Sequence, residues 1–346
     1  MNAPPEPVKN TQTVVILAIE SSCDETAAAV SKNGQVLSNI VATQSVHEHY
    51  GGVVPELASR AHQQHMVPVI HRALHEANIT KTMLSAVAFT QGPGLLGALL
   101  VGASFAKSLA WGLSVPLIGV NHMQAHILAH FIDSPQPTFP FLCLTVSGGH
   151  TQLVRVNNFL EMEVIGQTQD DAVGEAFDKM AKMVGLPYPG GPHIDRWAQS
   201  GNPEAYAFPE TQMPALDYSF SGIKTGFLNF LHQAKQRDPE FVSHHLADIC
   251  ASIQQTLIRM LLDKLVAAAE QTGIKQIAIA GGVSANQGLR KAVGRMADEK
   301  GWTVYIPKFE YCTDNAAMIA TTAYYQYMAE DFSNWQVSPN PRLAIM

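Results

Sequence analysis

Two histidines stand four residues apart in the segment VNHMQAHILAH, at positions 122 and 126. On a helix, residues i and i+4 lie on the same face, so His122 and His126 have the spacing of a metal-binding pair. His130 extends this row by one further turn. A zinc protease would also need a glutamate directly after the first histidine as general base, and Met123 occupies that position. The alternative is an amphipathic helix whose histidines form only local hydrogen bonds.

Two turns that follow apolar strands carry contrasting groups. In the turn SGGH, which begins at Ser147, small residues leave backbone N–H groups uncovered, and such groups bind phosphate or carboxylate oxygens. A plain glycine hairpin would have a similar sequence. At the corresponding point of the N-terminal half, the turn SSCDET carries Asp24 and Glu25. We expect one half to supply hydrogen-bond donors and the other to supply acids, although a solvent-exposed hairpin would also tolerate both carboxylates.

The segment DDAVGEAFDKMAKMVGLPYPGGPHID is dense in charge for a chain with 15% charged residues. Its i, i+4 spacing predicts salt bridges on a solvated helix face, Glu175 with Lys179 and Asp178 with Lys182. A solvated helix face does not explain the turn that follows, YPGG. Adjacent glycines ending at Gly191, close to Asp195, allow a ligand to approach the backbone.

Two further segments place polar groups where a helix is expected to begin. In IAIAGGVSANQGLR, an apolar strand runs into two glycines and a helix that begins near Ser284 or Asn286. Folds of the α/β class place nucleotides at such carboxyl ends of strands. The spacing matches neither GxGxxG nor GxxxxGK[ST], which excludes the dinucleotide fingerprint and the P-loop. In CTDNAAMIA, Asp314 precedes a helix, either as its N-cap or as a ligand.

The elements that must position these residues form a repeated pattern. Three apolar β-rich runs lie at 14–22, 27–31 and 35–43, and a similar set of three lies at 141–149, 151–156 and 159–168. Further along the chain, each set is followed by an apolar strand, a glycine-rich turn and a helix. An internal duplication explains this pattern, with an insertion at about 168–223 in the second copy. Helical periodicity is clearest at 57–78, 97–111 and 241–273.

Alternating strands and helices predict an α/β fold of two similar lobes that face a central cleft. Two separate α/β domains without a shared site are the alternative. The predicted organisation has four parts, a short flexible lead-in at 1–13, a first lobe at 14–135, a second lobe at 136–330 and a tail at 331–346.

Composition limits the class of protein. With 346 residues, 47% of them hydrophobic, the chain can bury a large core and is neither disordered nor fibrous. A formal charge of −7 would repel a polyanion, so nucleic-acid binding requires a local basic patch or a partner. The four cysteines form no CxxC pair, no signal-peptide pattern begins the chain, and polar residues interrupt the apolar run at 95–120. We therefore expect a cytoplasmic protein that does not cross a membrane.

Nine segments, in this order, carry a resemblance to a known family: AIESSCDETAAAV, YGGVVPELASRAH, TQGPGLLGALLVG, NHMQAH, TVSGGHTQL, DDAVGEAFDKMAKMVGLPYPGG, YSFSGIKTG, AGGVSANQGLR and CTDNAAMIA. They resemble the universal tRNA threonylcarbamoyladenosine transferase family (TsaD/Gcp/YgjD), and the match runs from about Val14 to Thr322. The resemblance implies the duplicated fold of actin, Hsp70 and the sugar kinases (ASKHA fold). It also implies transfer of threonylcarbamoyl from threonylcarbamoyl-AMP to N6 of the adenosine at position 37 of tRNAs that read ANN codons, with release of AMP.

The same resemblance implies the roles of particular residues. One divalent metal ion per subunit, assigned as iron with zinc or magnesium as alternatives, would be held by His122, His126 and Asp314. The threonylcarbamoyl-adenylate, or ATP or AMP in its place, would contact nine positions: Thr145, Val146, Ser147, Gly148, Gly149, Asp178, Gly191, Asp195 and Asn286. Asp24 and Glu25 are candidate catalytic residues.

The expected partners are the anticodon stem-loop of tRNA, a paralogous non-catalytic subunit (TsaB) and a small ATPase (TsaE), with no membrane involved. The apolar segments 57–74 and 97–111 are the expected docking faces. Gln124-Ala125 replaces the Glu-Gly pair that is frequent between the family's histidines, and the tail after Tyr324 is only loosely similar and has no assigned role. The competing functions are an ATP-binding regulatory or scaffold protein of the same fold, and a metal-dependent peptidase.

Overall fold

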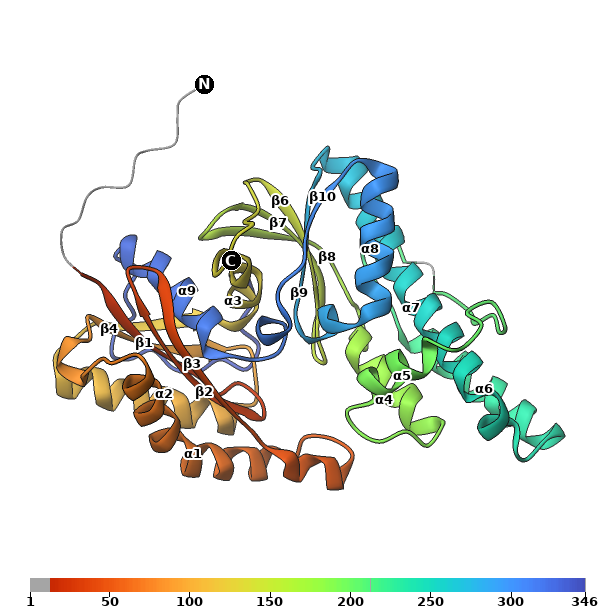
Figure 1. The fold of residues 1–346 in the computed structure, drawn as a ribbon, viewed down its shortest axis with the longest axis horizontal. Helices are drawn as coiled ribbons and strands as arrows, with labels where there is room; N and C mark the ends of the chain where they lie inside the picture. The colour runs from red at the N-terminus through yellow and green to blue at the C-terminus, as the bar shows by residue number, and fades with distance from the viewer. Residues whose placement is uncertain (1–12, 212, 346) are drawn as a thin grey trace.

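Two five-stranded mixed sheets of the same topology form the centres of two lobes (Figure 1). The computed structural model describes residues 13–211 and 213–345, so the predicted lead-in at 1–13 lies almost wholly outside the described residues. The first sheet has the order β3-β2-β1-β4-β5 and is built from β1 (Val15–Glu20), β2 (Glu25–Lys32), β3 (Gln35–Thr43), β4 (Ala86–Gly92) and β5 (Leu117–Asn121).

The second sheet repeats this arrangement. Its order is β10-β9-β6-β7-β8, and its strands are β6 (Phe141–Val146), β7 (Thr151–Asn158), β8 (Glu161–Gln167), β9 (Gln276–Ala280) and β10 (Thr303–Tyr305). In both sheets the first strand pairs antiparallel with the second and parallel with the fourth. The predicted duplication is therefore confirmed by strand order and strand direction.

Helices α1 (Pro55–Glu76) and α2 (Leu96–Leu113) pack together against the first sheet, and the apolar cluster beneath them includes Leu17, Phe89 and Ala106. Within the described residues, α2 alone is long and apolar enough to cross a membrane by length and composition. Core helices pass the same test, and α2 contacts β4 and α1 through its buried alanine and glycine face. The helix ends at Leu113, because the following residue, Ser114, has a left-handed φ of 55° that interrupts the helical hydrogen bonds.

In the described part of the second lobe there are five helices of more than eight residues: α4 (Val173–Met183), α5 (Gly190–Ala198), α6 (Ser221–Arg237), α7 (Phe241–Thr272) and α8 (Gln287–Lys300). The predicted insertion contains α4, α5 and the beginning of α6. Helix α7 ends at Gly273, where a φ of 69° suits glycine. These helices and one face of the second sheet share an apolar cluster that includes Phe177, Phe227 and Leu257.

Helix α9 (Ala316–Met328) falls in the range predicted for the second lobe, yet it packs on the first sheet. Its alanines join Ile16, Ala29 and Ile118 in one buried cluster. Because α9 follows β10 of the second lobe, the connection between them crosses the cleft. The remaining short elements are α3 (His122–Leu128) and the 3₁₀ turns η1 (Ser45–Tyr50), η2 (Lys81–Met83), η3 (Ala129–Phe131), η4 (Gly282–Ala285) and η5 (Phe309–Tyr311).

Candidate functional site

Three potential metal ligands from two elements meet in the cleft. His122 and His126 project from α3, and Asp314 lies in the segment that leads into α9. The Asp314 Oδ1 lies 3.3 Å from His122 Nε2 and 3.1 Å from His126 Nε2, and one ligand atom from each residue lies within 4.8 Å of the others. Asn315, and not Asp314, caps α9 by accepting from the Met318 N–H. The alternative role of Asp314 as helix cap is therefore wrong.

A fully buried glutamate that the sequence reasoning missed fixes the orientation of His122. Glu20 ends β1, and its Oε2 lies 3.0 Å from His122 Nδ1 and accepts a 2.6 Å hydrogen bond from Thr90 Oγ1. Its other carboxylate oxygen accepts from the Ser22 backbone N–H. A carboxylate on the outer nitrogen of a ligating histidine holds the ring and its tautomer. The signal in the sequence was an acid at the end of an otherwise apolar strand, VVILAIE.

The charges of this cluster favour a cation. Burial alone would lower the pKa of His122, but the carboxylates of Asp314 and Glu20 raise this pKa well above 6.5. Burial would likewise raise the pKa of the Asp314 carboxyl, but the two histidines hold it below its usual value. Burial and the neighbouring His122 lower the pKa of His126. Two carboxylates whose pKa values are lowered, Glu20 and Asp314, thus lie against two imidazoles, and this arrangement attracts a cation.

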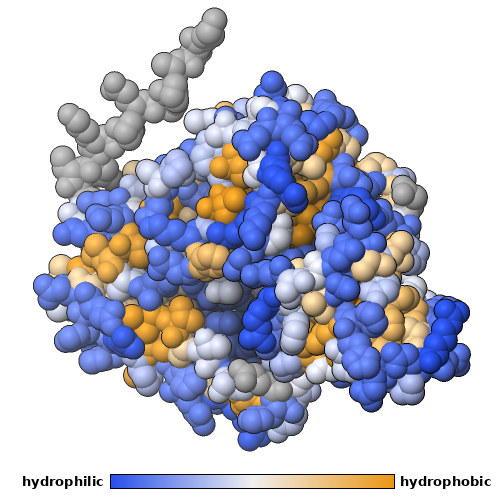
Figure 2. Space-filling model, turned by 45° about the vertical axis from the view of Figure 1, so that its right-hand side comes forward, coloured by the Kyte–Doolittle hydropathy of each residue, from blue (hydrophilic) through white to orange (hydrophobic). Residues whose placement is uncertain are grey.

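The acidic turn of the first lobe lies beside this cluster. Glu25 opens β2, and burial, followed by the charges of Asp314 and Asp24, raises the pKa of Glu25 to about 10. Tyr188, which the sequence reasoning did not single out, lies between the lobes. Burial and the charges of Asp24 and Asp178 raise the pKa of its hydroxyl. The surface is hollowed where the lobes meet (Figure 2).

The glycine turn of the second lobe is open toward ligands. The Ser147 N–H donates to the His150 carbonyl, which closes the turn, and the Gly174 N–H at the beginning of α4 donates to the Ser147 carbonyl. A Cβ added at Gly148 or Gly149 would meet no atom within 4 Å. Thr145 and Val146, in contrast, are fully buried at the end of β6. Burial and the two histidines of the candidate metal centre lower the pKa of His150 to about 4, so this turn faces that centre.

Asp178 does not form the solvated pair with Lys182 that its spacing predicted. Its Oδ1 accepts from the Gly190 N–H at 2.7 Å and from the Gly191 N–H at 3.3 Å. Burial raises the pKa of this carboxyl. The other expected pair does form, because Lys179 Nζ lies 2.8 Å from Glu175. Asp178 therefore holds the N-terminus of α5, and a Cβ at Gly191 would meet only a side-chain atom at 3.9 Å.

Asp195 and Asn286 occupy the N-terminus of α8. The Asp195 carboxylate accepts from the backbone N–H groups of Gln287 and Gly288 at 3.0 and 3.2 Å. Asn286 caps the helix by accepting from the Leu289 N–H, and its amide donates to Gln254 Oε1 at 2.7 Å. Both side chains therefore have structural partners. The helix begins at Gln287, close to the two predicted starting points.

His130 lies outside the ligand cluster. It belongs to η3, is buried, and its Nε2 lies 3.0 Å from the Ile279 carbonyl oxygen. Burial lowers its pKa to about 4. The structure thus brings together the two histidines and Asp314, places the acidic turn beside them, and excludes the third histidine of the row.

This arrangement defines a class of protein, a two-lobed α/β fold of duplicated topology whose candidate site residues gather where the lobes meet. Two solved structures share the fold. One is the (R)-2-hydroxyglutaryl-CoA dehydratase component A of Acidaminococcus fermentans, with a TM-score of 0.52 and 14% identity over 92% of this chain and 99% of that one. The other is full-length HypF, with a TM-score of 0.61 and 14% identity over 92% of this chain and 46% of that one. The fold is that of the ASKHA class, as predicted.

The family model for tRNA N6-adenosine threonylcarbamoyltransferase (TsaD) matches residues 35–321. A curated relative of that name in Cytophaga hutchinsonii is 64% identical over 96% of this chain and 97% of the relative. Another, in Christiangramia forsetii, is 62% identical over 96% of this chain and 98% of the relative. A relative of the same name in Clostridium botulinum is 48% identical over 96% of this chain and 98% of the relative. The chain belongs to this family.

Proposed function

We propose that this protein transfers the threonylcarbamoyl group from threonylcarbamoyl-AMP to N6 of adenosine 37 in tRNAs that read ANN codons, which forms t6A and releases AMP. Membership of the family supports the reaction. The observation that carries the proposal to this chain is the meeting of His122, His126 and Asp314 opposite an open glycine turn. The same cleft then holds a cation and an anionic adenylate.

The donor set supports one divalent metal ion per subunit. Two imidazoles and one carboxylate are ligands that iron(II) and zinc share, and three protein ligands leave positions open for substrate oxygens. We propose iron as the natural ion. The fit is supported by the convergence of both Nε2 atoms on one Asp314 oxygen and by Glu20 on the outer nitrogen of His122. A bound ion would polarise the carbamoyl or phosphate oxygen of the substrate.

The second lobe is proposed to bind the AMP part of the substrate. The backbone N–H groups of Gly148 and Gly149 in the glycine turn are suited to phosphate oxygens, whereas that of Ser147 is engaged by the His150 carbonyl. The open space at Gly191 and at Gly282 leaves room for the ribose and base. Asp178, Asp195 and Asn286 would then act mainly by holding the N-termini of α5 and α8 at this surface.

The chemistry requires an amine to attack a carbonyl carbon. The adenosine N6 attacks the carbamoyl carbon, the bond from this carbon to the phosphate oxygen breaks, AMP leaves, and the amine loses one proton. We propose that Asp24 and Glu25 orient the amine. Without a metal, the raised pKa of Glu25 keeps its carboxyl protonated near pH 7. A cation bound at the adjacent centre would lower this pKa and favour the carboxylate, which could then accept the proton of the amine. Backbone donors on the leaving phosphate would stabilise the charge that develops there.

We propose that tRNA binding needs partners, a paralogous non-catalytic subunit (TsaB) and a small ATPase (TsaE). Two of the basic groups in the strongest local clusters are already engaged, since Lys179 pairs with Asp171 and Glu175 and Arg290 donates to the Ser284 and Pro307 carbonyls. The exposed apolar side chains of α1 and α2 support these helices as a docking face, among them Val67, Leu96, Leu100 and Trp111. The four free cysteines support a cytoplasmic location.

Mass spectrometry of tRNA nucleosides tests the reaction. Unmodified tRNA is incubated with threonylcarbamoyl-AMP, the protein, its two partners and ATP, and the nucleosides are then analysed. We expect t6A at position 37 and none when this protein is omitted. A peptidase would instead cleave casein in the presence of metal. A regulatory or scaffold protein would leave t6A formation intact when His126 is replaced.

A further inference from the structure

The chain beyond α9 runs along the first lobe as a strap, defined here as residues 331–345. It follows the edge of the first sheet, where β5 has no strand partner on its outer side among the described residues. The Ser333 N–H donates to the Leu117 carbonyl, and Ser333 Oγ accepts from the Gly119 N–H at 2.8 Å. The strap therefore covers part of the edge strand that leads directly into α3.

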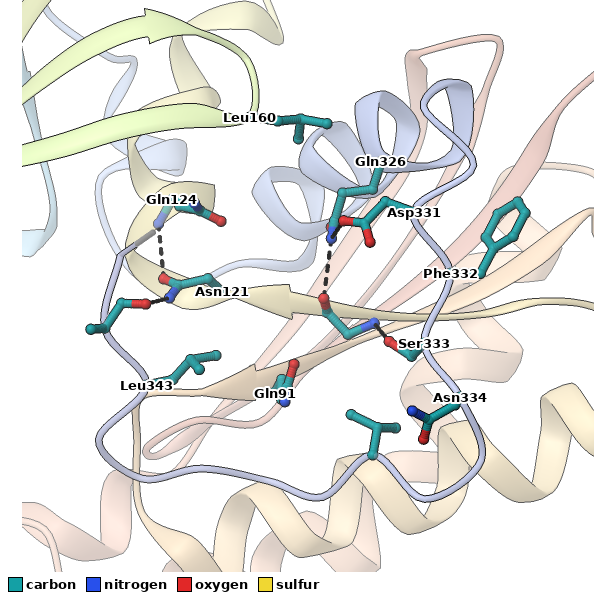
Figure 3. Close-up of a pocket in the computed structure, with 13 residues that line it drawn as sticks. Gln91, Asn121, Gln124, Leu160, Gln326, Asp331, Phe332, Ser333, Asn334 and Leu343 are labelled. Atoms are coloured by element: carbon teal, nitrogen blue, oxygen red, sulfur yellow. Dashed lines mark hydrogen bonds between the residues drawn. The ribbon is translucent and has the colours of Figure 1, made fainter.

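The middle of the strap is held at separate points. Lys107 on α2 donates to the carbonyls of Trp335 and Val337, and the Trp335 ring meets the Trp111 ring edge to face at 5.1 Å. The Asn340 N–H donates to the Gln91 carbonyl at the end of β4. A cavity of about 390 Å³ lies between the strap and the ends of β4 and β5 (Figure 3). Because this cavity separates part of the strap from the sheet, the strap is held there by the individual hydrogen bonds and the ring contact named above, and not by continuous packing.

The end of the strap reaches the helix that carries both histidines. The Ala344 carbonyl accepts a 2.8 Å hydrogen bond from Asn121 Nδ2 (Figure 3). Ile345 packs against the apolar cluster that includes Ile127 and Leu128 of α3. A hydrogen bond thus joins the strap to the beginning of α3, and Ile345 packs against the apolar cluster to which the end of α3 belongs.

Asn121 is the residue through which the polar contact acts. It is 8% exposed and immediately precedes His122. Its Oδ1 caps α3 by accepting from the N–H groups of Met123 and Gln124, at 2.9 and 3.2 Å. Its Nδ2 is the atom bound by the strap, so one side chain links the strap to the first turn of the helix.

We propose that Asn121 and the end of the strap position His122 and His126 for metal binding. A helix of seven residues is too short to be stable by itself, so its cap and its tertiary contacts must fix where the imidazoles point. The Ala344 carbonyl sets the orientation of the Asn121 amide, and the amide oxygen sets the first turn of α3. This inference rests on the metal site proposed above and assigns a role to a segment to which the family resemblance gave none.

Zinc affinity, measured by competition with a chelator, tests the inference with Zn²⁺ alone as the probe. Asn121→Asp keeps an oxygen that can cap α3 and loses the amide donor, and Asn121→Ser does so without adding charge. Removal of residues 341–346 takes away the acceptor. We expect each change to weaken zinc binding about tenfold, the usual scale for groups that support metal ligands. The double change should be no worse than the truncation alone, because the truncation already breaks the Asn121 contact together with the packing of Ile345.

Trp335→Ala is the matched control, because it removes a strap contact with α2 and leaves the end of the strap in place. It should keep full zinc affinity. Thermal unfolding followed by circular dichroism separates positioning from folding, because a purely structural strap would lower the melting temperature and leave zinc affinity unchanged. Unchanged affinity in both Asn121 variants, or additive losses in the double variant, overturns the inference. Absence of zinc binding in the unaltered chain overturns the metal site itself.

Discussion

The two lobes have the same strand order and differ in what their first turns carry. In the first lobe, the turn after β1 is lined by buried polar groups, with Glu20 bonded to Thr90 and to His122. In the second lobe, the turn after β6 has glycines with open space above them. One topology therefore serves two purposes. Under the proposed function, side chains of the first lobe would hold a cation beside acidic groups, and the glycine turn of the second lobe would bind an anion.

Two helices whose N-termini carry candidate site residues, α3 and α8, differ in the same sense. Helix α3 has seven residues, and both of its candidate ligands are buried, so its ends depend on Asn121 and on distant contacts. Helix α8 has 14 residues, and its N-terminus is already occupied by the Asp195 carboxylate. A protein carboxylate there removes a place where a ligand anion would otherwise bind. Of these two places, the Ser147 turn is therefore the better candidate for the proposed phosphate site.

Loss of a ligand should have the largest effect on the first lobe. His126→Ala, like His122→Ala, leaves two ligands, which rarely retain a divalent ion against water. We expect bound metal well below one ion per chain and loss of transfer activity, with the lobe still folded. Elemental analysis measures the metal. His130→Gln is the matched control, because His130 bonds to the Ile279 carbonyl and lies outside the cluster. Full occupancy in His126→Ala would show that the assignment is wrong.

The acidic turn should affect the rate of transfer. Glu25→Gln removes a carboxylate beside the candidate metal centre, and we expect kcat to fall about a hundredfold with little change in adenylate affinity. Single-turnover transfer to tRNA measures the rate, and adenylate titration measures the affinity. If turnover is unchanged in both Glu25→Gln and Asp24→Asn, and circular dichroism shows normal folding, these two residues take no part in the transfer.

The glycine turn should affect binding. An added methyl group at Gly148 meets no protein atom within 4 Å, so Gly148→Ala should fold normally and place the methyl where the phosphate is expected. We expect adenylate affinity to fall about tenfold, or about 1.4 kcal/mol. Gly112→Ala on α2, where a Cβ also meets no atom, is the control and should bind normally. Equal affinities for both variants would remove the turn from the binding site.

The smallest expected effect is a change in how the free energy of unfolding of the metal-free protein depends on pH. The pKa of Glu25 is raised to about 10 from 4.5, so between these values the folded chain binds more protons than the unfolded chain. The contribution of this group to stability therefore falls as pH rises. Glu25→Gln removes that loss, and its stability relative to the unaltered protein should increase from about pH 5 to about pH 9. Urea unfolding at several pH values measures this difference, which a solvated Glu25 would leave constant.

The fold was predictable because it depends on patterns that are local in sequence. Repeated apolar runs separated by small polar turns predicted both sheets, and 3.6-residue periodicity predicted α1, α2 and α7. The position of α9 was not predictable in this way. Its apolar alanines fit either lobe, and only the connection from β10 across the cleft places it on the first sheet.

The candidate ligands were predicted, and the groups that orient them were not. The spacing of His122 and His126 identifies one helical face, but the contact between Glu20 and His122 joins residues 102 positions apart. Asp178 illustrates the opposite error. Its spacing to Lys182 indicated a salt bridge, whereas the fold brings the glycine N–H groups of α5 to its carboxylate. Tertiary contacts of this kind have no local signal in one sequence.

The division of roles between the two turns is tested most directly by the rate of t6A formation at saturating threonylcarbamoyl-AMP. If the first-lobe acid acts in transfer and the second-lobe turn acts in binding, Glu25→Gln should remain about a hundredfold slow at saturation. Gly148→Ala should recover nearly the full rate once the substrate is in excess. Recovery of Glu25→Gln at saturation, together with a persistent defect in Gly148→Ala, would contradict the account.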